Sequence, residues 1–160
     1  MNDIILRSDV RADDARAVRD IVSSTGFFYE EEIAVAVELV DERLNKGEVS
    51  GYHFLFVESS GRTVGYACFG PTPCTQASWD LYWIAVHPDF RGKGIGKTLL
   101  AASEETIRAA GGRRIYIETA SRELYAPTRA FYLACGYVME ALLQDFYAPG
   151  DSKCIFVKVI

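Results

Sequence analysis

A glycine-rich loop between an apolar segment and an amphipathic segment is the feature that most constrains the fold of this chain. Residues Asp80–Val86 are apolar or aromatic at most positions on both faces, which is typical of a strand buried in the centre of a sheet. The loop Arg91-Gly92-Lys93-Gly94-Ile95-Gly96 follows it. Beyond the loop, helical spacing relates Leu99, Leu100, Ser103, Ile107 and Ala110. We therefore expect a strand, a loop and a helix that packs on the sheet.

Two helices are expected between an N-terminal strand, Ile4–Leu6, and a β-hairpin. Asp13 or Asp14 can cap the first helix, which ends at Thr25-Gly26. The second helix begins near three glutamates, where negative charge complements the helix dipole, and its expected buried residues are Ile33, Val37, Val40 and Leu44. The hairpin joins strands at 52–58 and 63–69 through the turn sequence Ser-Ser-Gly-Arg.

Four further elements are expected after the loop helix. They are a strand at Arg114–Thr119, a short helix with Pro127 in its first turn, and two strands at 137–146 and 153–159. The order β-α-α-β-β-β-α-β-α-β-β contains no internal repeat and no linker. It predicts one mixed α/β domain over residues 1–160.

Composition limits the classes of protein to consider. The 160 residues suffice for one hydrophobic core, and the net charge of −5 argues against a general affinity for nucleic acid or for anionic membranes. No apolar run approaches the roughly 18 residues of a membrane span, and the N-terminus lacks a signal sequence, so we expect a cytoplasmic protein. The four cysteines are scattered without metal-ligand or redox spacing, so no metal is expected.

The glycine-rich loop has three candidate interpretations. Glycines at alternate positions before a helix, with Arg91 and Lys93 beside them, favour an anion site. A nucleotide-hydrolase loop fails because Arg91 stands where its first glycine belongs, and a dinucleotide loop fails because Leu99 stands where its third glycine belongs. A plain surface turn would need only one glycine.

Two motifs in the expected order carry a resemblance to a known family. The segment Ile84–Gly96 is similar to the acyl-CoA motif of the GNAT superfamily of N-acyltransferases, whose core is Arg/Gln-x-x-Gly-x-Gly/Ala. The segment Ala130–Tyr137 is similar to its second signature, a helical Phe/Leu-Tyr followed by three residues and Gly-Phe/Tyr. The resemblance implies an N-acetyltransferase with acetyl-CoA as co-substrate. It also implies a mixed, mostly antiparallel sheet of about seven strands with about four helices.

The resemblance also implies roles for particular residues. Backbone groups of Ile84, Ala85 and Val86 would meet the pantetheine arm and the thioester carbonyl. The pyrophosphate would be held by Arg91, Gly92, Lys93, Gly94, Ile95, Gly96 and Lys97. Tyr132 matches the tyrosine that hydrogen-bonds the coenzyme sulfur and acts as general acid. Many relatives carry an asparagine seven residues earlier, where this chain has Tyr125.

The base and the acceptor are left open by the sequence. A primary amine with a pKa near 10.4 is only about one part in a thousand neutral at physiological pH, so a base is expected. Glu118 and Asp80 are both candidates, although each is also consistent with a solvated charge at a strand end. Glu30-Glu31-Glu32, beside three aromatic residues, would suit a cationic acceptor and equally suit a helix start.

Three functional hypotheses follow from these motifs. The leading one is direct attack of an amine on acetyl-CoA in a ternary complex, because no cysteine has an evident activating partner for a covalent route. The second is a non-catalytic acyl-CoA sensor or scaffold, and the third is a nucleotide-binding domain. The acceptor can be a small molecule or a peptide. The terminal strands can pair across a homodimer or close the sheet within one chain.

Overall fold

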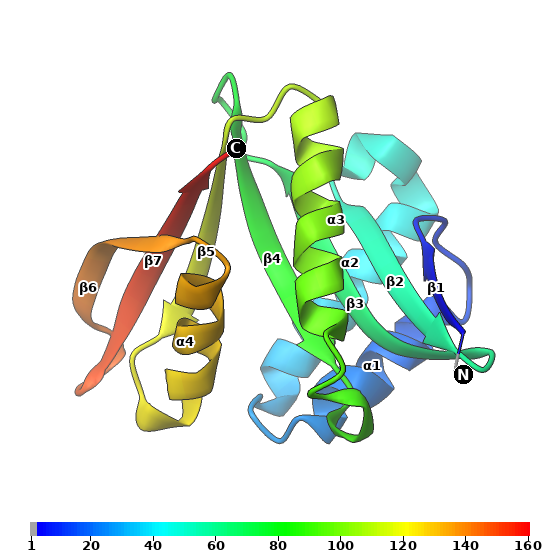
Figure 1. The fold of residues 1–160 in the computed structure, drawn as a ribbon, viewed down its shortest axis with the longest axis horizontal. Coiled ribbons are helices and arrows are strands. Elements are labelled where there is room, and N and C mark those ends of the chain that lie inside the picture. The colour runs from blue at the N-terminus through cyan, green and yellow to red at the C-terminus, as the bar shows by residue number, and fades with distance from the viewer. Residues whose placement is uncertain (1–2) are drawn as a thin grey trace. The chain divides into compact units, whose positions relative to one another are not determined.

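The computed structural model describes residues 3–160, which divide into two compact units (Figure 1). The first unit contains the residues up to Gly70 together with Trp83–Thr106. The second unit contains Pro71–Tyr82 and Ile107–Ile160. Two strands and one helix have residues in both units: β3, by its last residue, β4 and α3.

The elements within residues 3–160 follow the expected order. They are β1 (Ile4–Arg7), α1 (Asp14–Ser24), α2 (Glu30–Lys46), β2 (His53–Ser59), β3 (Arg62–Pro71), β4 (Ser78–Val86), α3 (Ile95–Ala109), β5 (Arg114–Ala120), α4 (Ala126–Ala134), β6 (Val138–Ala148) and β7 (Asp151–Val159). The strand order is β1-β2-β3-β4-β5-β7-β6. Among the described strands, only the pair β4–β5 is parallel, over Ser78–Leu81 with Arg114–Ile117. The predicted α/β class with a mostly antiparallel seven-stranded sheet and four helices is confirmed for the described residues.

In the first unit, helices cover both faces of β3, and α1 and α2 also cover one face of β2. Side chains alternate along a strand, so Gly65 and Tyr66 point to opposite faces of β3. Tyr66 is buried in a core with Val18 of α1 and Val40 of α2. Gly65 lies against the first turns of α3, at Ile95 and Leu99. Helices on each side explain why β3 is buried on both faces along most of its length.

Two expected core residues are exposed instead. Leu44 is 41% exposed, because the last turn of α2 extends past the core cluster, whose last α2 residue is Val40. Ala110 is exposed because α3 ends one residue before it. The N–H of Gly112 donates to the carbonyl of Ile107, which reverses the chain and turns residue 110 outwards.

The second unit has α4 packed on an antiparallel part of the sheet (Figure 1). The ring of Tyr132 on α4 lies 5.8 Å from that of Phe156 on β7. Arg129 of the same helix donates to the carbonyl of Ala120 at the end of β5, at 2.8 Å. These contacts fix α4 across the ends of β5 and β7. The outer strand, β6, remains largely exposed, for example at Val138, which is 62% exposed.

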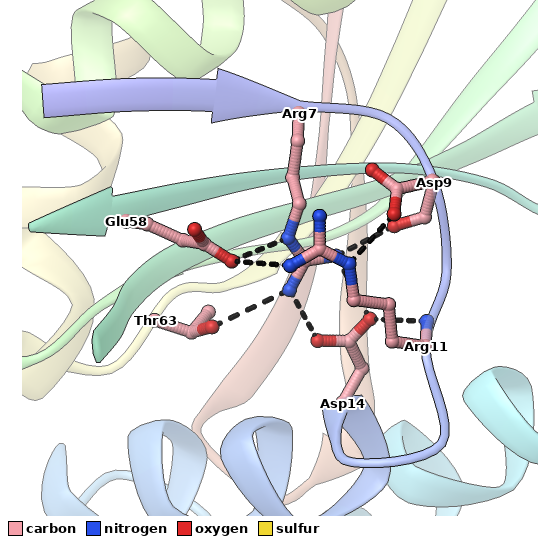
Figure 2. A network of polar contacts seen from close by, with 6 residues as sticks. All are labelled: Arg7, Asp9, Arg11, Asp14, Glu58 and Thr63. Carbon is pink, nitrogen blue, oxygen red and sulfur yellow. Dashed lines mark hydrogen bonds and ion pairs between the residues drawn. The ribbon is translucent and has the colours of Figure 1, made fainter. Parts of the chain in front are cut away.

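A buried charge network connects β1 to α1 and β2 in the first unit (Figure 2). The guanidinium of Arg7 contacts Asp14 Oδ1 at 2.5 Å and Glu58 Oε1 at 2.6 Å. Burial lowers the pKa of Arg7, but hydrogen bonds and charge interactions with Asp14 and Glu58 outweigh it and raise the pKa. Asp14 Oδ2 also accepts from the N–H of Arg11 at 2.7 Å, whereas the side chain of Asp13, at the N-cap position, makes no cap hydrogen bond. The first turn of α1 is therefore held to β1 by charge.

Replacing Arg7 tests this network. The side chain of Asp14 is only 2% exposed, so Arg7→Met leaves a buried carboxylate without its main counter-charge. We expect the free energy of unfolding, measured with urea, to fall by about 3 kcal/mol. Arg16→Met removes an exposed arginine of α1, the helix that contains Asp14, and should change the free energy of unfolding by less than about 0.5 kcal/mol. Equal effects of the two variants would contradict a stabilising role for the network.

Candidate functional site

The glycine-rich loop lies in the first unit, between the end of β4 and the start of α3. The N–H of His87 donates to the carbonyl of Val64 at 2.8 Å, which fixes the end of β4 to β3. A short 3-10 helix, Pro88–Phe90, then leads to the loop. Gly92 and Gly94 have φ angles of 74° and 79°, a left-handed conformation that other residues adopt only at a cost. The predicted need for glycine in this loop is therefore explained by its backbone.

Gly65 lets α3 begin close to the sheet. A Cβ at this position would lie 3.2 Å from Cγ2 of Ile95 and 3.3 Å from both the carbonyl oxygen of Ala85 and Cδ1 of Leu99. A side chain at this position would require these neighbours to move by a few tenths of an ångström, so glycine favours the close approach of α3. The helix N-terminus, with its partial positive charge and its first N–H groups, is thereby fixed beside the end of β4.

Aromatic rings hold two cations beside the loop. The guanidinium of Arg91 lies 5.4 Å from the centroid of the Phe27 ring, and Nζ of Lys93 lies 4.9 Å from that of Phe90. Both cations are exposed, as is Lys97 in the first turn of α3. Exposed positive side chains, a left-handed glycine backbone and a helix N-terminus together form an arrangement that binds phosphate groups.

Tyr132 lies in the second unit within an aromatic cluster on α4. It is 5% exposed, with ring centroids of Phe131, Tyr137 and Phe156 at 5.6, 6.0 and 5.8 Å. Burial, and to a lesser extent the nearby thiol of Cys135, raises the pKa of Tyr132 well above that of a free phenol. The phenol therefore stays protonated at physiological pH and can donate a hydrogen bond.

The two candidate carboxylates, Asp80 and Glu118, lie in the second unit in different environments. Asp80 is half-buried and its Oδ2 accepts a hydrogen bond from Oγ1 of Thr72 at 2.8 Å. Burial raises the pKa of Asp80, and the charge of Glu118 adds to that rise, against the opposing effect of the Thr72 hydrogen bond. Glu118 is exposed, and its Oε2 is 2.9 Å from Nζ of Lys153. A half-buried carboxylate with a raised pKa is the better proton acceptor.

Sequence reasoning missed the partners of these carboxylates. Thr72 belongs to the turn between β3 and β4, and Lys153 comes from β7. Nζ of Lys153 also lies 3.9 Å from the centroid of the Phe146 ring. Burial, followed by the charges of Glu118 and Asp151, raises the pKa of Tyr147 to about 12. No local motif indicates Lys153, Phe146 or Tyr147, because the pairing of β5, β6 and β7 brings them together, whereas Thr72 contacts Asp80 from the turn that leads into β4.

The acidic start of α2 has structural roles in the first unit. Oε1 of Glu30 is 2.8 Å from Nη1 of Arg19. The carboxylate of Glu32 accepts from the N–H of Tyr29 at 2.8 Å, as in a capping box. Two of the three glutamates are thus engaged in forming the helix start. The arrangement favours that interpretation over a cation site.

Tyr125 is buried and stands where many relatives carry an asparagine. Tyr125 ends a short 3-10 helix before α4, and the guanidinium of Arg122 lies 5.5 Å from the centroid of its ring. The ring of His53 on β2 stacks on that of Phe69, with centroids 5.8 Å apart, and burial, followed by the charge of Arg43, lowers the pKa of His53.

Within residues 3–160, no group of three or more potential ligands is arranged to hold a metal ion. None of the helices in that range combines the length and apolar character that crossing a membrane requires.

Comparison with known proteins relates this chain to one protein family. Residues 15–137 match the family model of the acetyltransferase (GNAT) family. A crystal structure from Desulfovibrio desulfuricans, assigned to an acetyltransferase of the GNAT family, is 46% identical, with a TM-score of 0.97 over 98% of this chain and 99% of that chain. The PaiA N-acetyltransferase of Thermoplasma acidophilum, in complex with coenzyme A, is 18% identical, with a TM-score of 0.77 over 99% of each chain. A Bacillus subtilis (strain 168) protein, assigned as a ribosomal protein bS18-alanine N-acetyltransferase, is 22% identical over 107 residues, 67% of this chain and 68% of that protein.

Proposed function

Because this chain belongs to the acetyltransferase (GNAT) family, we propose that it transfers the acetyl group of acetyl-CoA to an amine by direct attack in a ternary complex. The observation that carries the proposal is the loop before α3, where two left-handed glycines and two positioned cations precede a helix N-terminus. This arrangement fits a diphosphate ester, and a relative of the same fold was solved with coenzyme A.

The loop is proposed to bind the pyrophosphate of the coenzyme. Backbone N–H groups of residues 92–97 would donate hydrogen bonds to its oxygens, with Arg91, Lys93 and Lys97 supplying positive charge. Ile84, Ala85 and Val86 would offer backbone groups to the pantetheine arm and to the thioester carbonyl. The ladder between β4 and β5 covers Ser78–Leu81, which supports a separate role for the later residues of β4.

Tyr132 is proposed to stabilise the leaving thiolate by a hydrogen bond. An ordinary phenol titrates near 10 and a thiol near 8.5, so complete transfer of the proton is already uphill by about 2 kcal/mol. Burial raises the pKa of Tyr132 further and makes complete transfer less favourable. Donation without full transfer is therefore the role that the buried phenol supports.

Asp80 is proposed as the base, or as the end of a water chain that takes the proton of the attacking amine. Its raised pKa makes it a better proton acceptor than an exposed carboxylate. Glu118, the other candidate, already has Lys153 as a partner at 2.9 Å. The negative charges of Asp80 and Glu118, which the strand pairing places near each other, also suit an acceptor amine that is positively charged before it loses its proton.

The acceptor is proposed to be an amine on a small molecule or on a peptide N-terminus. The name of the Bacillus subtilis relative, which refers to an alanine of a ribosomal protein, supports including peptide N-termini among the candidates. A non-catalytic acyl-CoA sensor remains the alternative function. It would need the loop, but it would need neither the hydrogen bond from Tyr132 nor a base.

Three organisational proposals accompany this function. Residues 1–160 would act as one N-acetyltransferase domain, which the match of residues 15–137 supports. The location would be the cytoplasm, where acetyl-CoA is available. A homodimer could form through β6, whose apolar side chains at Val138 and Leu142 are 62% and 51% exposed on an edge strand.

Gly94→Ala tests the loop. A non-glycine residue in a left-handed conformation costs about 1–2 kcal/mol, so the variant should rearrange the loop and weaken acetyl-CoA binding about tenfold in calorimetric titration. Gly111→Ala places the same strain after the last turn of α3, with the same open space around it, and should leave binding unchanged. Micromolar binding of ATP without binding of acetyl-CoA would overturn the proposal.

Tyr132→Phe tests the proposed hydrogen bond to the thiolate. Loss of a hydrogen bond to a charged group, about 1.5–3 kcal/mol, should lower kcat roughly 10- to 100-fold while acetyl-CoA affinity is kept. Steady-state kinetics with detection of the released thiol measures the effect. Tyr137→Phe serves as the matched control, because it removes the hydroxyl of a buried tyrosine whose ring packs on that of Tyr132. Unchanged kcat in Tyr132→Phe would remove this residue from the mechanism.

A further inference from the structure

One face of the sheet in the second unit carries a row of polar side chains. Asp80 on β4 lies opposite Tyr116 on β5. Glu118 is two residues further along β5 and so points to the same face. It lies opposite Ile155 on β7, and Lys153 is two residues from Ile155 on that face. Asp80, Glu118 and Lys153 thus share one face, whereas Phe156 and the ring of Tyr132 packed on it lie on the other.

Glu118 is fixed at its place in this row. Lys153 holds its carboxylate at 2.9 Å, and the side chain of Lys153 is only 13% exposed. The ring of Phe146, 3.9 Å from Nζ, covers the ammonium group. A cation held between a carboxylate and an aromatic face has little freedom to move. The charge of Glu118 therefore acts on Asp80 from a defined position.

Thr72 contacts Asp80 from the turn before β4. Its hydroxyl donates to Oδ2 of Asp80 at 2.8 Å. The turn itself is fixed, because the N–H of Thr72 donates to the carbonyl of Ser78 at 2.9 Å. One carboxylate oxygen of Asp80 is thereby oriented by a neutral donor.

We propose that Thr72 and Glu118 are positioning residues for Asp80: Thr72 orients its carboxylate, and Glu118, held by Lys153, sets the charge that surrounds it. This inference rests on the proposed role of Asp80 as the base. The two residues act in opposite senses on the protonation of Asp80. The negative charge of Glu118 favours the protonated form, whereas the hydrogen bond from Thr72 favours the carboxylate.

Other titratable groups face Asp80 from the neighbouring elements. Tyr116 lies opposite it on β5, and Lys153 belongs to β7. Tyr147 on β6 has a pKa raised to about 12, so it is neutral wherever Asp80 titrates.

Carboxyl NMR of the coenzyme-free protein, labelled with ¹³C at aspartate, tests the inference directly. The signal of Asp80 is identified by its absence in Asp80→Asn. Glu118→Gln removes a negative charge and should move the titration midpoint of Asp80 down by on the order of half a pH unit. Thr72→Val removes the donor and should move it up by a similar amount. The acid limb of kcat/KM, which reports the base in the free enzyme, should move in the same two directions.

Conservative and control variants separate positioning from general damage. Thr72→Ser keeps a hydroxyl and should restore the wild-type midpoint. Glu140→Gln makes the same change on the exposed strand β6 and should shift nothing. Shifts in the same direction, or none, in Glu118→Gln and Thr72→Val would overturn the inference. A different outcome would be opposite shifts of the Asp80 midpoint in Glu118→Gln and Thr72→Val, together with full turnover in Asp80→Asn. That outcome would support the positioning of Asp80 and overturn its proposed role as the base.

Discussion

The close packing of α3 on β3 is the constraint on which the geometry of the glycine loop depends. Gly65 offers no side chain, so Ile95 and Leu99 in the first turns of α3 can lie directly on the strand. The helix N-terminus is thereby fixed beside the end of β4, which a backbone hydrogen bond from His87 to Val64 ties to β3. A glycine-rich loop between two such fixed ends presents its N–H groups in one arrangement, and such preorganisation favours tight binding of a phosphate ester.

The second unit separates two kinds of chemistry by the two faces of its sheet. On one face, Tyr132 is buried among aromatic rings and keeps its proton. On the other face, Asp80 and Glu118 form a polar row. A buried phenol is suited to donate a hydrogen bond, and a half-buried carboxylate is suited to accept a proton. In the proposed reaction these two tasks fall on different atoms, the leaving sulfur and the attacking nitrogen.

The sequence predicted those parts of the site that depend on local structure. The loop and Tyr132 belong to continuous motifs, and the strands and helices follow from periodicity over neighbouring residues. The Lys153–Glu118 contact escaped prediction because it depends on which strands pair and in which register. The Thr72–Asp80 contact escaped it because it depends on the conformation of the turn before β4. The predicted burial of Leu44 was wrong for a related reason: helical spacing identifies a face, whereas the extent of the core opposite that face is set by other elements.

The central claim is that this chain moves an acetyl group from acetyl-CoA to an amine. It is tested most directly by release of free coenzyme A thiol in the presence of polyamines, amino acids, aminoglycosides and peptide N-termini, with mass analysis of each acceptor. We predict acceptor-dependent thiol release that matches formation of the acetylated amine one for one. Tight binding of acetyl-CoA without acceptor-dependent release across these classes would contradict the claim and favour a non-catalytic sensor.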